Sequence, residues 1–237
     1  MVSLVMISKG FSQESSSFYG SFESNGIYYQ DNENEKYNEQ FASNNYLNLN
    51  YIFNSDWSFE AQVESYSPLR LQGYSDSFEK THLSTLNINY TKKGFGLTFG
   101  SIYEQFGSGL ILRTWEDRQL GINNSIWGLR STYENDNISL KLVGGFQKKG
   151  SQISVGKVIG LDSEITVFSS DQIYQNLTVG LSYVGRFENL AVPAIYPPVG
   201  YDFNDLTNLF SARIDYEKND FYVGYEQIHK TKDGIAQ

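Results

Sequence analysis

Residues 46–66 read YLNLNYIFNSDWSFEAQVESY, and this stretch decides the fold. In residues 46–53 apolar side chains at positions 47, 49, 51 and 53 alternate with asparagines at 48 and 50. Residues 57–66 alternate in the same way, with Trp57, Phe59 and Val63 on one face. The Asn-Ser-Asp triplet between the two runs is typical of a tight turn. A period of two on both sides of a turn predicts a β-hairpin.

The same period recurs along the rest of the chain. Nine further runs alternate clearly or weakly, so that about eleven half-apolar strands are expected in total. The nine runs are residues 18–29, 85–91, 95–104, 126–134, 138–146, 158–168, 177–188, 210–217 and 221–230.

The connections between these runs fall into two classes. NSD, KKG, ENDN and KND are short turns, whereas the first, third, fifth and ninth runs are followed by long polar segments. Nothing in a soluble sandwich sorts its loops in this way, but a membrane barrel has short turns at one end and long loops at the other. We therefore expect an all-β, antiparallel, up-and-down transmembrane β-barrel. A soluble antiparallel β-sandwich that acts as a binding module remains open, because its polar rows would face water.

In a membrane barrel the apolar rows face lipid and the polar rows face the interior. Aromatic residues beside the tight turns, such as Trp57 and Phe221, suit a girdle at the membrane interface. The charged residues expected to line the lumen are Glu60, Glu64, Glu104, Lys141, Arg186, Arg213 and Asp215.

The two ends of the sequence carry separate expectations. Residues 1–13 resemble the remnant of a signal peptide, and the alternative is a buried first strand. Residues 14–237 then form the N-terminal part of a single barrel. An odd number of strands leaves an open edge, which indicates an incomplete barrel and thus a fragment of a longer protein.

Composition excludes several functions. A net charge of −9 argues against a nucleic-acid partner. The absence of cysteine removes thiolate catalysis and Cys-based metal sites. No phosphate-binding, dinucleotide or metal motif is present, so no cofactor and no metal are expected. The partners expected are outer-membrane lipid and a small polar solute in the lumen.

Residues 106–125, FGSGLILRTWEDRQLGINNS, hold the densest group of candidate site residues. These are Arg113, Trp115, Glu116, Asp117 and Arg118. One interpretation is a loop that folds inward and is pinned to the wall by ion pairs, since arginine matches carboxylates in a bidentate fashion. A second is a binding site for an acidic or sugar-like solute, and a third is catalysis. Nothing pairs the carboxylates as glycosidases require.

A hydrolase with its site at the rim is the alternative function. His82 and His229 lie near strand ends, and Asp76 or Asp233 would be the partner of such a histidine. Neither histidine belongs to a spaced metal motif. A pair of ordinary polar rim residues explains the same pattern.

Several stretches resemble a family of uncharacterised Bacteroidota outer-membrane β-barrel proteins, catalogued as a domain of unknown function. They are SFYGSFESNGIYYQ, NNYLNLNY, SIYEQFGSGLILRTWEDRQLGINNSIWGLR, KVIGLDSEI and ARIDYEKNDFYVGYEQIHKTKDG. The resemblance runs from about residue 16 to the end, and it implies an outer-membrane location. Members are usually much longer, in line with a fragment. The resemblance brings no substrate and no catalytic residue. A non-enzymatic channel, transporter or cell-surface structural component is therefore expected.

Overall fold

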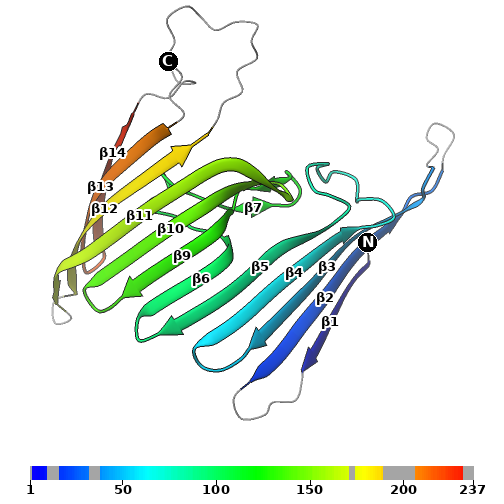
Figure 1. The fold of residues 1–237 in the computed structure, drawn as a ribbon, viewed down its shortest axis with the longest axis horizontal. Coiled ribbons are helices and arrows are strands. Elements are labelled where there is room, and N and C mark those ends of the chain that lie inside the picture. Colours follow the sequence, from blue (N-terminus) through cyan, green and yellow to red (C-terminus); the bar gives the residue numbers. More distant parts are fainter. Residues whose placement is uncertain (1, 10–15, 32–37, 171–173, 189–205, 232–237) are drawn as a thin grey trace, which may run out of the picture.

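The computed structural model describes residues 2–9, 16–31, 38–170, 174–188 and 206–231. These residues form one antiparallel sheet of 12 strands and a separate two-stranded pair. The sheet is open and curved, with β1 and β14 at its two ends (Figure 1). Strands that follow each other in the chain pair with each other in the sheet. The exception is β6, which pairs directly with β9, because β7 and β8 lie between them in the chain but form a separate sheet.

The strands have the following bounds. They are β1 (Val2–Lys9), β2 (Ser17–Tyr28), β3 (Phe41–Ile52), β4 (Trp57–Tyr66), β5 (Thr81–Lys92), β6 (Phe95–Ile102), β7 (Glu116–Asp117), β8 (Ile122–Asn123), β9 (Ile126–Glu134), β10 (Ile138–Lys149), β11 (Gln152–Ser170), β12 (Gln175–Phe187), β13 (Leu206–Lys218) and β14 (Phe221–Lys230).

All eleven expected strands are present, and the all-β antiparallel prediction is confirmed. The prediction of a transmembrane β-barrel, incomplete in this fragment, is not confirmed, because the sheet is not closed. Among the described residues β1 and β14 are edge strands, each paired on one side only. Residues 2–9, expected as part of a signal-peptide remnant or as a first strand, pair with β2. The signal-peptide interpretation stays a prediction.

The tight turns follow from their sequences. The side chain of Asn54 accepts hydrogen bonds from the backbone N–H groups of Asp56 and Trp57, at 2.9 and 3.0 Å. Asn135 does the same for Asn137 and Ile138. An asparagine that holds its own turn in this way favours a hairpin at that position. Between β5 and β6, Lys93 and Gly94 both have positive φ, as a two-residue hairpin turn requires.

The sheet has a polar face and an apolar face. Residues opposite each other on paired strands point to the same side. Glu60 is opposite Asn87, Lys141 is opposite Asp162, and all of them lie on the polar face. The apolar face carries large side chains that stay exposed. Examples are Leu47, Phe59, Ile88, Phe99, Leu129, Leu142, Leu161, Leu181, Phe210 and Ile214.

Aromatic side chains gather near the tight turns, as expected. Phe53, Trp57 and Phe221 are all exposed, and Trp57 stacks at a tilt on Tyr90, with ring centroids 4.8 Å apart. In the described part of the chain no helix is long and apolar enough to cross a membrane.

Candidate functional site

The segment of residues 103–125, here called the crossing segment, connects β6 to β9 and lies over the polar face of the sheet. It contains the pair β7–β8 and an isolated bridge between Gln105 and Arg113 (Figure 1). Its side chains contact residues of β4, β9, β10 and β14. The segment therefore lies on the polar side of the sheet, and the inward-folding loop stays a prediction.

A small apolar core lies between the crossing segment and the sheet. Phe106 of the segment is fully buried, and Ile111 and Leu112 are buried beside it. The sheet contributes five buried side chains to this core: Ile102, Ile126, Val143, Val158 and Val184. Leu110 remains exposed, so only two of the three expected hydrophobic residues at 110–112 pack inward. Burial of a large apolar side chain contributes about 1.5–3 kcal/mol, which favours the folded position of the segment.

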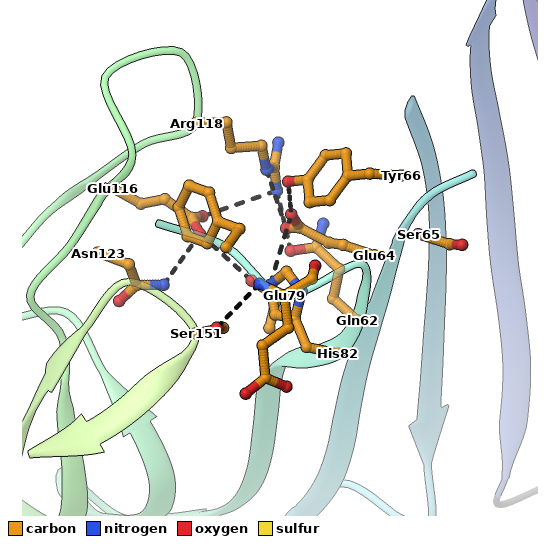
Figure 2. A network of polar contacts seen from close by, with 12 residues as sticks. Gln62, Glu64, Ser65, Tyr66, Glu79, His82, Glu116, Arg118, Asn123 and Ser151 are labelled. Atoms are coloured by element: carbon orange, nitrogen blue, oxygen red, sulfur yellow. Dashed lines mark hydrogen bonds and ion pairs between the residues drawn. The ribbon is translucent and has the colours of Figure 1, made fainter. Parts of the chain in front are cut away.

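The first of three polar anchors joins the segment to β4 (Figure 2). Arg118 donates from Nε to Glu64 at 2.9 Å and from its terminal nitrogen to Gln62 at 2.9 Å. Glu64 is fully buried, and Tyr66 donates its hydroxyl to the same carboxylate at 2.6 Å. A buried carboxylate is tolerated when it is paired and hydrogen-bonded in this way. We call this contact the β4 anchor.

Aromatic rings surround the β4 anchor. The guanidinium of Arg118 lies 4.6 Å from the ring centroid of Tyr46, a cation–π distance. Tyr46 meets Tyr66 edge to face, and Phe78 stacks on the His82 ring at 5.5 Å. Beside these rings Glu64 is fully buried, and the low dielectric around its carboxylate strengthens the pairing with Arg118.

Electrostatics keep Arg118 charged. Burial lowers the pKa of its guanidinium, but the facing carboxylates of Glu64 and Glu116 outweigh burial, so that the pKa lies above its ordinary value. Glu116 is 3.7 Å from Arg118 and accepts hydrogen bonds from Asn123 and Ser84. The carboxylate of Glu116 thus links β7, β8 and β5.

The second anchor, the central anchor, is formed by Glu104. Its carboxylate lies 2.5 Å from Arg130 Nε of β9 and 3.3 Å from Lys141 Nζ of β10. The backbone N–H of Glu104 also donates a hydrogen bond to the hydroxyl of Thr114 at 2.6 Å. One buried carboxylate therefore holds two neighbouring strands and the start of the segment together.

The third anchor, the β14 anchor, joins Ser108 to Glu226. The hydroxyl and the backbone N–H of Ser108 both donate to this carboxylate, and the N–H distance is 3.2 Å. Beside it Gly107 lies directly over Arg213, with φ of 52°, where a Cβ would come within 2.5 Å of the arginine side chain. Arg213 is itself buried and pairs with Asp162 and Glu164 at 2.8 Å.

Only some of the five candidate site residues between positions 113 and 118 join these anchors. Arg118 and Glu116 belong to the β4 anchor. Asp117 instead accepts the backbone N–H of Leu120 at 3.0 Å and shapes a turn. Trp115 is 40 % exposed, and Arg113 is exposed with no ion pair in the described part of the chain. The five residues are close in sequence, but the structure does not bring them together into one site.

The residues expected to line a lumen share one environment. By strand register, the members in the sheet all lie on its polar face, and Glu104 reaches the same face from the crossing segment. The members in the sheet are Glu60, Glu64, Lys141, Arg186, Arg213 and Asp215.

Sequence reasoning missed several residues of the β4 anchor. Tyr66 shares the alternation of β4 with Glu64, so the period of two contained that signal. His82 could not be placed on this face, because a register shift between β4 and β5 interrupts the alternation next to it. Tyr46 carried no signal of its own, because its partner Arg118 is far away in the sequence.

The structure separates the residues of the rim hydrolase alternative. His82 is buried, with Nε2 3.8 Å from Glu64, whereas Asp76 pairs with Arg70. His229 lies opposite Phe210 and thus belongs to the apolar face. Asp233 lies outside the described residues. Within the described ranges no group of three or more His, Cys, Asp or Glu side chains could hold a metal ion.

Comparison with known proteins adds one relationship. No curated protein and no solved structure matches the chain. A family model described as a family of unknown function, DUF6029, matches residues 1–237. The chain therefore belongs to the DUF6029 family, a family of unknown function.

Proposed function

We propose that the chain forms wall strands of an outer-membrane β-barrel in a Bacteroidota bacterium, and that the barrel acts as a non-enzymatic channel or transporter narrowed by the crossing segment. In this arrangement the apolar face contacts lipid and the polar face lines the interior. The crossing segment lies in the interior and restricts it. A structural role at the cell surface is the alternative within the same class.

The contrast between the two faces carries the proposal. Soluble monomers rarely expose contiguous apolar patches larger than a few hundred Å². Here large apolar side chains such as Leu142, Leu161 and Leu181 are exposed on successive strands of one face. The opposite face holds buried ion pairs and a folded segment. Such a division suits lipid on one side and water on the other.

The position of the crossing segment supports a restricted interior. It is held to β4, to β9 and β10, and to β14 by its three anchors. A segment held at several points across a polar interior would reduce the open cross-section. The anchors use charged and polar side chains, so water can still wet the remaining passage.

The test uses the protein as its gene encodes it, expressed in a bacterium with two membranes. We expect it in the outer-membrane fraction, and unboiled protein should migrate faster on a denaturing gel than boiled protein. In planar bilayers the purified protein should open steps of lasting conductance. Recovery as a detergent-free soluble protein would overturn the membrane proposal. Membrane localisation with a permanently silent bilayer would leave only the structural role.

A further inference from the structure

A trough lies on the polar face, in the half of the sheet next to the tight turns. Its volume is about 540 Å³, and residues of β4, β5, β6 and β9 line it. Tyr103, at the start of the crossing segment, lines it as well. The trough is separate from the β4 and β14 anchors, whose carboxylates and arginines do not line it.

The polar groups of the trough have unused hydrogen-bonding capacity. Within the described residues, the carboxylates of Glu60 and Glu134 have no ion-pair partner, and only a long contact of 3.5 Å from Asn87 reaches Glu60. The side-chain oxygen of Asn87 is buried without a hydrogen-bond partner in the same part of the chain. This oxygen is closed off beside Gly100, but the two carboxylates and the Asn87 amide nitrogen keep hydrogen-bonding capacity that a polar ligand can use.

The arrangement of these groups selects the ligand. Asn87 and Asn89 offer amides, Glu60 and Glu134 offer carboxylates, and Arg130 keeps its terminal donors after its Nε binds Glu104. Planar groups with two polar atoms match the vicinal hydroxyls of a sugar. The Tyr103 ring is 39 % exposed, and its hydroxyl is fixed by Asn123, so that a sugar can stack on the ring face. An anion would meet two carboxylates here.

We propose that this trough binds a neutral oligosaccharide. The proposal names the solute class of the interior and rests on the proposed function for the route of that solute across the membrane. The binding itself requires only the polar face. Glu60, Asn87, Asn89, Glu134 and Arg130 bind the hydroxyls, and Tyr103 stacks on the ring.

The experiment is calorimetric titration of the full-length protein, purified in a detergent that carries no sugar headgroup, because a maltoside would compete. Maltotriose is the probe, and spermidine and citrate are the charged comparisons. We expect saturable binding of maltotriose. Asn87→Ala should weaken it about five- to tenfold, as expected for one or two lost hydrogen bonds. Asn176→Ala is the matched control. It also removes an asparagine amide from the polar face of the sheet, but on β12 and outside the trough.

Glu60→Gln provides a second variant of nearly unchanged shape, in case Asn87→Ala does not fold. It should also weaken maltotriose binding about five- to tenfold, because hydrogen bonds to charged groups are the stronger ones. Tighter binding of spermidine or citrate than of maltotriose would overturn the proposal, and so would equal maltotriose affinity in all variants. Conductance without saccharide binding would refute this site alone. Saccharide binding without conductance would refute the channel and leave the site standing.

Discussion

Arg118 donates a hydrogen bond to the fully buried carboxylate of Glu64 at 2.9 Å, although the two residues are 54 positions apart in the sequence. This pair fixes one end of the crossing segment to β4. Arg118 is one-third exposed and remains partly hydrated, whereas Glu64 is not exposed at all. The buried charge of Glu64 therefore depends on the ion pair for its compensation.

Replacing the buried carboxylate should release the end of the crossing segment. Glu64→Gln removes the charge that Arg118 faces, and hydrogen bonds to charged groups contribute about 1.5–3 kcal/mol. We expect thermal stability to fall and trypsin to cut faster after Arg118. Peptide mapping by mass spectrometry identifies the cleavage site. Glu60→Gln, on the same strand and face without an ion pair, should change neither quantity. Equal proteolysis of both variants would contradict the β4 anchor.

The close approach of Gly107 to Arg213 should make that glycine hard to replace. Gly107→Ala places a methyl group 2.5 Å from an arginine that Asp162 holds in place. Overpacking of this kind costs about 1–3 kcal/mol, in addition to the strain of positive φ. Gly73→Ala is the matched control, because φ is 89° there but no atom lies within 4 Å. Thermal unfolding of both variants measures the difference. Equal losses would show that only backbone strain matters.

The two faces of β12 should respond differently to a new charge. In a bilayer, arginine at mid-depth of the lipid-facing side costs about 2–4 kcal/mol. Leu181→Arg, in the middle of β12 and 59 % exposed on the apolar face, should therefore destabilise the protein folded in liposomes. Thr178→Arg on the polar face should cost much less. Denaturant titration in liposomes measures both. A harmless Leu181→Arg would contradict lipid contact at this face.

The turn between β3 and β4 should lose stability in acid. Lys92 donates to Asp56 at 2.9 Å, and this hydrogen bond is the main reason why the pKa of Asp56 is lowered. The stabilisation is therefore complete above the unfolded-state pKa of about 3.9, and it is lost as the pH falls through the lower folded-state pKa. Lys92→Gln should raise the Asp56 pKa in an NMR titration. Lys93→Gln, which alters the neighbouring lysine, should leave it unchanged.

The strands were predictable because each of them contains its own signal. The alternation in residues 126–134 and 221–230 gave both bounds of β9 and β14. The alternation in 158–168 missed the start of β11 at Gln152, because a register shift near Phe146 and Lys148 breaks the pattern. β7 and β8 have two residues each, which is too short for any period to be visible.

The site was less predictable, because its contacts join distant parts of the chain. Sequence alone placed Arg118 and Glu116 in an ion-pair network, and it named Glu64 and Glu104 as interior carboxylates. It could not tell that Arg113 stays exposed and takes no part in the ion pairs of the described residues, since neighbours in an irregular segment have no fixed period. Nor could it find the contact between Ser108 and Glu226, which are 118 positions apart. Such contacts depend on the curvature of the whole sheet.

The anchors of the crossing segment have a mechanical consequence. β4 and β14 are separated by seven strands in the sheet, yet a single stretch of backbone is attached to both. Such an attachment acts as a chord across an arc, and its length limits how far the arc can flatten. The radius of this β-structure is then set by a tether inside it as well as by strand twist, and cutting the tether should let the arc widen.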